Sequence, residues 1–234
     1  MPQSLTLLLG KKVGVMVKSK SSTSSYIQVS GVADQVARET HMPAISTKTG
    51  DAGESGLADG QRLGKDKLVF EVLGTIDEAN AWLGMCLAAV DALPKDFQKK
   101  TMVHWNQLRE IQDSLFHIGA EVAASPKTSL AVERLSRLEA LSTKTQAHLA
   151  AKWMTKFFYP GGHELAARLD VTRTVFRRVE RLLVRHHRDR SLSPTILKFT
   201  NRCSDYLYVL RVLVNAELAV TEHVFQVSPS KKVV

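Results

Sequence analysis

The strongest constraint on the fold is a series of apolar residues at helical spacing within the stretch 96–123. Its members, three or four residues apart, are Leu108, Ile111, Leu115, Ile118 and Val122. This spacing places them on one face of a helix. A helix with one apolar face buries that face against other elements. The stretch therefore predicts a helix that forms part of a shared core.

The rest of the chain supplies partners of the same kind. The predicted helices cover about 75–93, 96–123, 129–154, the segment around 173–181, and 194–222. The first is expected to begin at a capping box, in which the Thr75 hydroxyl accepts a hydrogen bond from the backbone N–H of Glu78. The sequence has little strand character. Five helices with short connections predict an all-α fold, a five-helix bundle with up-down packing.

Charged residues gather on one face of the fourth predicted helix. The first is Arg173, and the others follow it by four, seven and eight residues: Arg177, Glu180 and Arg181. Val175 and Val179 fall on the opposite face, where a core is expected. Guanidinium groups suit phosphate or carboxylate ligands, so this face predicts a polyanionic ligand. A solvated basic face is the alternative.

The overall charge also favours an anionic partner. A net charge of +9 and a pI near 9.6 suit a nucleotide, a nucleic acid or a membrane surface. The two cysteines, Cys86 and Cys203, are too few for a disulfide framework and are expected to be buried thiols. No apolar run approaches the roughly 20 residues that cross a bilayer. We find neither metal-ligand spacing nor a nucleophile elbow.

Residues 1–42 differ in composition from the rest of the chain. The first 33 positions contain no acidic residue, while lysines and a Ser/Thr-rich cluster at 19–25 are present. The lysines are Lys11, Lys12, Lys18 and Lys20. This composition is typical of an organelle transit peptide, and a disordered tail without a targeting role is the alternative. We assign the folded domain to 43–225 and expect a disordered tail at 226–234.

Two further segments have the composition of a ligand site. Around 45–60 the chain combines hydroxyls, Lys48 and four glycines, which suits a phosphate although the spacing is not that of a Walker A loop. Lys65 lies close enough in sequence to reach the same anion. An ordinary surface loop is the alternative. The aromatic run Phe157–Tyr159 precedes the turn Pro160–Gly162 and suits either core packing or the wall of a pocket for a flat ligand.

The last predicted helix carries a polar stripe on an otherwise apolar surface. Asp205 and Tyr208 follow Asn201 by four and seven residues, which places the three on one face. Such groups need hydrogen-bonding partners if they are buried. An ion pair between Asp205 and the arginine helix is one way to satisfy them.

Together, these segments resemble the PduO-type ATP:cob(I)alamin adenosyltransferases. The resemblance extends from about residue 45 to 216 and rests on five motifs in the same order. They are Thr47–Asp51, Gly74–Glu78, Phe157 with Pro160–Gly162, Arg173–Arg181 and Asn201–Asp205. Lys65-Asp66 and Val69–Glu71 are most similar to mitochondrial members. With the N-terminal composition, this similarity predicts the mitochondrial matrix; the cytoplasm is the alternative.

The resemblance implies a ferritin-like bundle that forms a homotrimer, with each active site between neighbouring subunits. It implies transfer of the 5′-deoxyadenosyl group of ATP to cob(I)alamin, the substrate, with release of triphosphate and with Mg²⁺ bound alongside ATP. The implied ATP-binding residues of one subunit are Thr47, Lys48, Thr49, Gly50, Ser55, Gly56 and Lys65. Those of its neighbour are Arg177, Arg178, Val179, Glu180, Arg181 and Asn201.

The same resemblance implies roles on the cobalamin side. Phe157 matches the aromatic residue beneath the corrin that displaces the lower axial base, and Asp205 matches a residue near the cobalamin. With Arg177 they are the implied catalytic residues. Asp77 and Arg173 match an inter-subunit ion pair. A cobalamin-dependent acceptor enzyme and a reductase are further implied partners, whereas nucleic acid is not.

The chain departs from the pattern of this family at five positions. They are Glu54 and Gly56 in the glycine loop, His163 after the Gly pair, Asp170 where histidine is usual, and Cys203 where leucine is usual. Glu54 adds negative charge near the expected triphosphate. These departures bear on ATP affinity and on the contacts with cobalamin.

Two other functions fit parts of the same pattern. A cobalamin chaperone of the same fold would bind and deliver the corrinoid without transferring an adenosyl group. A basic helical bundle that binds nucleic acid or acts as an adaptor would use the net charge without chemistry. The interleaving of Glu180 with the arginines, and the lack of a nucleic-acid-binding motif, favour the enzyme over the adaptor.

Overall fold

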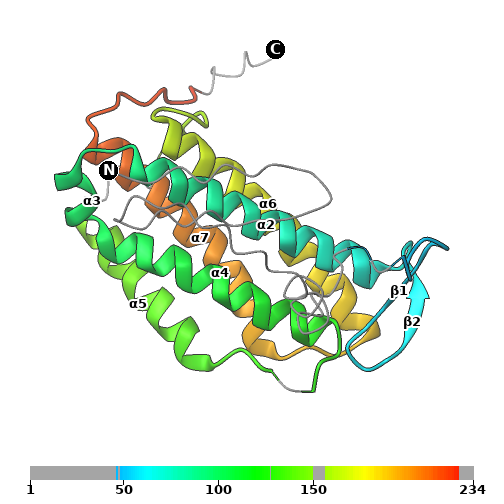
Figure 1. Ribbon diagram of the computed structural model, residues 1–234. Helices are drawn as coiled ribbons and strands as arrows, with labels where there is room; N and C mark the ends of the chain where they lie inside the picture. The colour runs from blue at the N-terminus through cyan, green and yellow to red at the C-terminus, as the bar shows by residue number, and fades with distance from the viewer. Residues whose placement is uncertain (1–45, 47, 127, 150–155, 227–234) are drawn as a thin grey trace, which may run out of the picture. The chain divides into compact units, whose positions relative to one another are not determined.

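The computed structural model describes residues 46, 48–126, 128–149 and 156–226 (Figure 1). The predicted N-terminal segment 1–42, Thr47 and residues 227–234 of the predicted tail lie outside these ranges. The chain divides into two units, 1–48 and 49–234. The described helices and strands all belong to the second unit.

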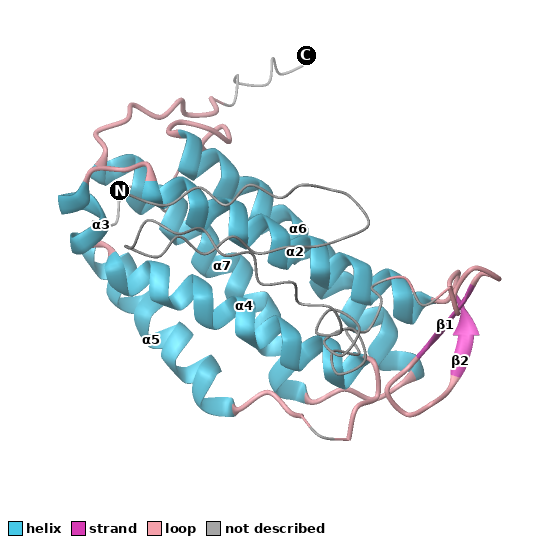
Figure 2. Ribbon diagram, in the orientation of Figure 1, coloured by secondary structure: helices cyan, strands magenta, loops and turns pink. Residues whose placement is uncertain are grey.

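The described part of this unit is mostly helical and contains six helices. They are α2 (Leu68–Asp91), α3 (Lys95–Lys100), α4 (Met102–Val122), α5 (Val132–His148), α6 (Glu164–Asp189) and α7 (Pro194–Glu217). Two short strands, β1 (Glu54–Gly56) and β2 (Arg62–Gly64), pair as an antiparallel hairpin before α2. Figure 2 shows the long helices side by side, with the hairpin beyond the start of α2. None of the described helices combines the length and apolar character needed to cross a membrane.

One hydrophobic core joins the helices. Helix α6 packs along both α2 and α7, α5 packs against α7, and α4 packs against α2. The apolar series predicted on α4 is fully buried in this core, so the interpretation of that face is confirmed. Helix α7 also buries residues on more than one side, including Phe199, Leu207 and Val212. Helices α6 and α7 therefore form the centre from which the polar residues of the site project.

The predicted start of the first helix was wrong. Helix α2 begins at Leu68, and Thr75 lies inside it, where its hydroxyl donates a hydrogen bond to the Glu71 carbonyl at 2.7 Å. Val69 and Val72 are both buried. They extend the apolar face of the helix towards the N-terminus. Burial of that face stabilises helical structure in the residues before Thr75, where the capping box predicted the helix to begin.

Other boundaries also differ from the prediction. The predicted helix 96–123 is interrupted at Thr101, whose hydroxyl donates to the Phe97 carbonyl at 2.5 Å and accepts from Trp105 Nε1 at 2.9 Å. Helix α5 ends at His148 and α7 ends at Glu217, both earlier than expected. The hairpin was not predicted because its strands are three residues long and rich in glycine.

A buried histidine links α4 to α7. His104 Nδ1 lies 2.9 Å from the Tyr206 hydroxyl, and both side chains are buried. Burial, and secondarily the charge of His148, lowers the pKa of His104 from 6.5 to about 4. The folded protein therefore keeps this imidazole neutral at a pH where the unfolded chain protonates it.

We expect the stability of the protein to fall as the pH is lowered from 6.5 towards 4. In this window the unfolded chain binds a proton at His104 that the folded chain excludes, so protonation favours unfolding. The free energy of unfolding should decrease by at most about 1.4 kcal/mol per pH unit from this group. Urea denaturation of wild type and His104→Gln across this window measures it. Parallel pH profiles for the two proteins would contradict the assignment.

Candidate functional site

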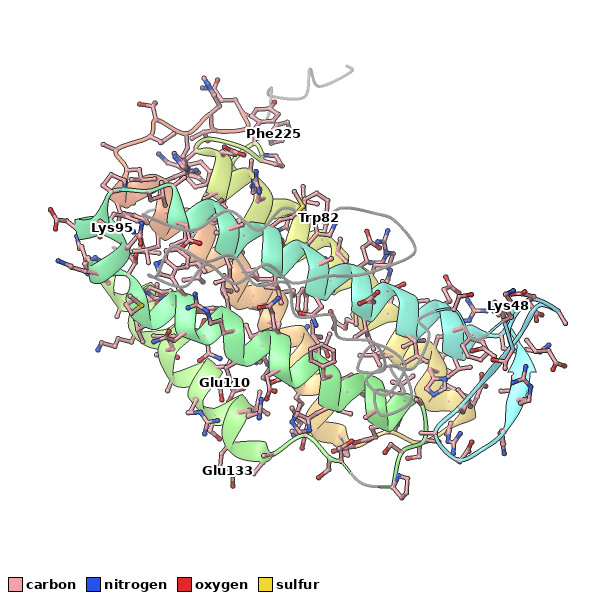
Figure 3. The ribbon with its side chains drawn as sticks, viewed as in Figure 1. Lys48, Trp82, Lys95, Glu110, Glu133 and Phe225 are labelled. Atoms are coloured by element: carbon pink, nitrogen blue, oxygen red, sulfur yellow. The ribbon has the colours of Figure 1, made fainter. Side chains whose placement is uncertain are left out.

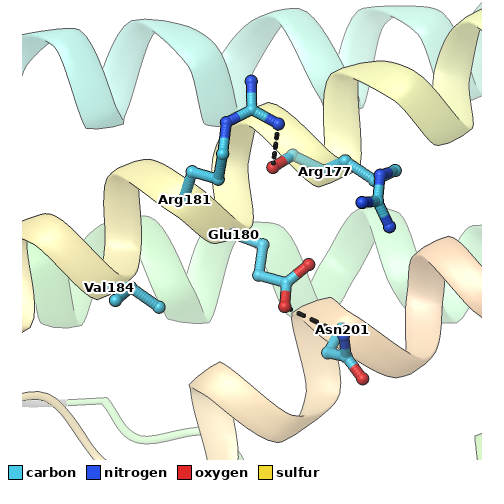
Figure 4. Close-up of a pocket in the computed structure, with 5 residues that line it drawn as sticks. All are labelled: Arg177, Glu180, Arg181, Val184 and Asn201. Carbon is cyan, nitrogen blue, oxygen red and sulfur yellow. Dashed lines mark hydrogen bonds between the residues drawn. The ribbon is translucent and has the colours of Figure 1, made fainter.

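A pocket lies on the seam between α6 and α7. It has a volume of about 360 Å³ and is lined by Arg177, Glu180, Arg181, Val184 and Asn201 (Figure 4). All but one of these residues come from a single face of α6. The pocket lies on the face that the sequence predicts to bind a polyanion, and its use as a binding surface stays a prediction.

Hydrogen bonds order the floor of this pocket. Glu180 Oε1 accepts from Asn201 Nδ2 at 2.8 Å, which ties α6 to α7. Arg181 donates through Nη1 to the Arg177 carbonyl at 3.1 Å. Among the described residues, neither Arg177 nor Arg181 forms an ion pair with a carboxylate. Two exposed guanidinium groups are therefore available to an anion, beside an amide and a carboxylate that are already oriented.

Two predicted ATP-binding residues of α6 do not line this pocket. Val179 is fully buried in the core, so its side chain contributes packing rather than ligand contact. Arg178 forms an ion pair with Glu78 of α2. Successive residues on a helix point about 100° apart, and for this reason Arg177 and Arg178 face different neighbours.

The glycine loop is built as a hairpin whose backbone carbonyls are held by cations. Arg62 Nη2 donates to the Thr49 carbonyl at 2.7 Å, and Lys65 Nζ donates to the Gly50 carbonyl at 2.8 Å. Ser55 and Gly56 lie in β1. No residue of this hairpin lines the α6–α7 pocket in the same chain. Within the second unit, the described loop residues of the implied ATP site, from Thr49 to Lys65, therefore do not share a pocket with its α6 residues.

The unusual Glu54 has a partner inside the hairpin. Its carboxylate lies 3.5 Å from Arg62 Nε, and both side chains are about half exposed. The pair offsets the negative charge that the sequence places in this loop. Lys48 is exposed and has a positive φ of 58°.

The aromatic turn is held by the chain that follows α7. Phe225 N donates to the Phe157 carbonyl at 2.7 Å, and Tyr159 N donates to the His223 carbonyl at 2.9 Å. The Phe157 side chain is 79% exposed. It is presented to its surroundings instead of filling the core, which favours the predicted role as a pocket wall.

Sequence reasoning missed a buried polar cluster behind this turn. Arg211 of α7 contacts Asp170 of α6, the Tyr159 carbonyl and Glu222. Asn215 binds Glu222 and the turn. An arginine within the apolar stretch of α7 was the available signal, because a buried charge requires a partner.

Arg173 and Asp77 do not meet within this chain. Arg173 Nε lies 3.5 Å from Asp170, and its guanidinium stacks 5.9 Å from the Tyr208 ring centre. Asp77 is exposed on α2. Their predicted inter-subunit pairing stays a prediction.

Asp205 is also exposed, and it pairs with Arg202 on its own helix at 2.9 Å. The expected partner on the arginine helix was wrong, because the exposed face of α7 turns Asp205 towards Arg202. Figure 3 shows the many charged side chains that cover the helical unit.

The remaining departures have structural roles. His163 caps α6, with Nδ1 accepting from the Leu165 N–H at 3.1 Å. Cys203 is fully buried, and burial raises its pKa well above that of a free thiol. Cys86 is likewise buried, with a pKa raised to about 11. Neither thiol is suited to act as a nucleophile.

The chain is similar to proteins of one family. The family described as Cobalamin adenosyltransferase matches residues 45–214. A corrinoid adenosyltransferase of Bacillus subtilis (strain 168) is 38% identical over 176 residues, covering 74% of this chain and 86% of that protein. A cobalamin adenosyltransferase of Cupriavidus metallidurans is 36% identical over 171 residues, covering 73% of this chain and 88% of that protein.

Solved structures agree with these relatives. A variant of a PduO-type ATP:corrinoid adenosyltransferase from Lactobacillus reuteri, complexed with cobalamin and ATP, superposes with a TM-score of 0.68 at 29% identity. The match covers 78% of this chain and 96% of that one. The family predicted from the motifs is confirmed.

Adjacent arginines of α6 should contribute unequally to ATP binding. Because Arg177 lines the pocket and Arg178 pairs with Glu78, Arg177→Ala should weaken ATP binding at least about tenfold, the loss of a charge-assisted contact. Arg178→Ala should weaken it by less than about threefold. Isothermal titration with ATP measures both. Equal losses would contradict the assignment of the pocket.

Proposed function

Because the chain belongs to the cobalamin adenosyltransferase family, we propose that it transfers the 5′-deoxyadenosyl group of ATP to cob(I)alamin. The products are adenosylcobalamin and triphosphate. The observation that carries this function is the α6–α7 pocket, where two guanidinium groups without carboxylate partners in the described part of the chain lie beside the Glu180–Asn201 pair.

The reaction needs alignment more than it needs a protein nucleophile. The electron pair of Co(I) forms the bond to C5′ of ATP, while the bond from C5′ to the triphosphate oxygen breaks and its electrons leave with triphosphate. The nucleophile belongs to the substrate. The protein contributes by aligning cobalt with C5′ and by stabilising the departing negative charge. The burial of both cysteines is consistent with this division of roles.

Arg177 and Arg181 are suited to hold the triphosphate. Their guanidinium groups lie at the same pocket, and planar guanidinium groups bind phosphate oxygens in pairs. Glu180 accepts from Asn201 and has a second carboxylate oxygen for a nucleotide hydroxyl or amino group. We assign it to orienting the nucleoside.

The Mg²⁺ ion is proposed to enter with ATP. Within the described residues, no group of three or more His, Cys, Asp or Glu side chains could hold a metal ion. Glu180 supplies one carboxylate to the pocket. The phosphate oxygens of ATP would supply most of the ligands, as is usual for Mg²⁺ at nucleotides, and the bound ion would offset the charge of the triphosphate.

The glycine hairpin is proposed to close the ATP site from a neighbouring subunit. Its phosphate-binding candidates are Thr47, Lys48, Thr49, Gly50, Ser55, Gly56 and Lys65. The hairpin does not line the pocket of its own chain, which is consistent with a site completed by a second copy. We propose a homotrimer, with the long helices of each subunit forming a ferritin-like, up-down five-helix bundle in which α3 is a short extension before α4.

The ion pair of Asp77 with Arg173 is proposed to support this trimer. Asp77→Asn should weaken association about tenfold, corresponding to a loss of about 1.4 kcal/mol. Asp91→Asn, an exposed position on the same helix, is the matched control. Sedimentation velocity over a concentration series measures both. The proposal fails if wild type sediments as a monomer, or if both variants associate like wild type.

On the corrinoid side, Phe157 is proposed to displace the lower axial base, with Asp205 nearby. An apolar ring that excludes the base and water favours four-coordinate cobalt, which is more easily reduced to Co(I). The high exposure of Phe157 supports contact with a ligand. Phe157 and Asp205 act on the cobalamin, and Arg177 acts on the triphosphate.

Corrinoid absorption, followed with ATP and a reductant, tests the reaction. Wild type should convert cob(I)alamin to adenosylcobalamin, and corrinoid binding without conversion would identify a chaperone instead. Phe157→Ala should lower turnover at least about tenfold while changing ATP affinity less than about twofold, because its ring acts on cobalt alone. Equal losses in turnover and ATP affinity would contradict this role.

We also propose that residues 1–42 direct the protein to the mitochondrial matrix, where a reductase would supply Co(I) and a cobalamin-dependent enzyme would receive the product. The support is the basic, Ser/Thr-rich composition of this segment. A fluorescent reporter fused to residues 1–42 should enter mitochondria. The matched control replaces Lys11, Lys12, Lys18 and Lys20 by glutamine and should stay in the cytosol. A cytosolic wild-type reporter would reject the assignment.

A further inference from the structure

A single buried guanidinium joins the aromatic turn to three other parts of the fold. The Arg211 side chain is 1% exposed. Its Nε donates to Asp170 Oδ2 of α6 at 3.0 Å, and its Nη2 donates to the Tyr159 carbonyl at 2.9 Å. Its Nη1 forms an ion pair with Glu222, in the segment after α7. One side chain of α7 therefore connects α6, the turn and the C-terminal segment.

A buried amide one turn along α7 holds the same parts. Asn215 Nδ2 donates to the Gly161 carbonyl at 3.1 Å and to Glu222 Oε1 at 2.9 Å, while Oδ1 accepts from His163 N at 3.0 Å. Gly162 has a φ of +96°, and a Cβ at this position would lie 2.5 Å from the Asn215 amide. The turn requires glycine there so that the amide can approach the backbone.

The charges of this cluster balance. Arg211 and Arg173 face Asp170 and Glu222, so two positive groups meet two negative groups. Removing one member would leave a buried charge without its partner, which is strongly unfavourable. Asp170 is the residue that stands where the family usually has histidine, and its carboxylate fits this position because Arg211 lies opposite.

The cluster contacts the turn through the backbone atoms of the turn. Arg211 and Asn215 reach the carbonyls of Tyr159 and Gly161, and Asp170 accepts from the Gly161 N–H at 3.3 Å. Phe157 itself is bound to the C-terminal segment through the Phe225 N–H. Since the Phe157 ring is largely exposed, the position of the ring depends on the backbone that these contacts hold.

We propose that Arg211 and Asn215, together with Asp170 and Glu222, are positioning residues that fix Phe157 for the corrinoid. This inference rests on the proposed function. Glu222 contacts both Arg211 and Asn215 and belongs to the segment that binds the Phe157 and Tyr159 backbone. Loosening Glu222 therefore releases the turn and the C-terminal segment together, without touching the α6–α7 pocket.

Glu222→Ala tests the proposal in the full-length protein. Hydrogen exchange at the backbone amides of Tyr159 and Gly161 should accelerate at least about tenfold, since their local opening becomes easier. The kcat/KM for cobalamin should fall at least about tenfold, while the ATP dissociation constant changes less than about twofold. Glu164→Gln is the matched control, because Glu164 pairs with Arg168 on the exposed side of α6; it should leave all three quantities unchanged.

Several outcomes would overturn the positioning role. They are unchanged exchange, faster exchange with unchanged cobalamin kinetics, and equal losses for cobalamin and ATP. If Glu222→Ala does not fold, Glu222→Gln, which keeps the shape and an acceptor oxygen for Asn215, should show the same pattern at smaller amplitude, and its absence counts against the proposal. A wild-type protein without adenosylation activity would instead reject the proposed function, while the exchange data would still decide whether the cluster holds the turn.

Discussion

The antiparallel pairing of α6 with α7 is the constraint on which the rest of the site depends. Polar contacts recur along this seam, from Asp170 with Arg211 at one end to Glu180 with Asn201 at the other. Arg173 stacks near Tyr208 between them. Asp170 and Glu180 are about 15 Å apart along the axis, at roughly 1.5 Å per residue. One pair of helices therefore carries both the anion pocket and the support of the aromatic turn.

This separation has a consequence for where the substrates meet. A triphosphate held at Arg177 and Arg181 would lie some way along the seam from the Phe157 turn. The nucleoside would then have to span part of this distance for C5′ to approach the cobalt. The glycine hairpin does not enter the pocket of its own chain, and Arg62 and Lys65 hold it in a defined shape. A preformed hairpin and a preformed pocket that do not meet are the two surfaces that a second subunit would bring together, in line with the proposed trimer.

The sequence predicted the parts of this architecture that depend on local periodicity. The apolar face of α4 and the charged face of α6 could be located because helical spacing separates buried from exposed positions. The start of α2 could not, because burial of Val69 and Val72 overrode the local capping signal at Thr75. The ion-pair partners of Arg178 and Asp205, which are Glu78 and Arg202, could not be predicted either. Each pairing depends on which neighbour a particular helix face meets. Asp170 lies 41 residues before Arg211, and only the packing of α6 against α7 brings the two together. Glu222 reaches Arg211 because the segment after α7 folds back onto the helix.

The choice of arginine at position 211 follows from the number of acceptors around it. A carboxylate of α6, a backbone carbonyl of the turn and a carboxylate after α7 surround one buried side chain. A lysine ammonium is a compact point charge, whereas the planar guanidinium donates in several fixed directions at once. It also lies 5.8 Å from the Phe158 ring centre, an apolar neighbour that an ammonium with its strong hydration suits less well. A buried ionic cluster gives little net stability over apolar packing. Its contribution is therefore to set the position of the backbone that it contacts. It fixes the backbone path of a turn whose exposed aromatic side chain has no core of its own to hold it.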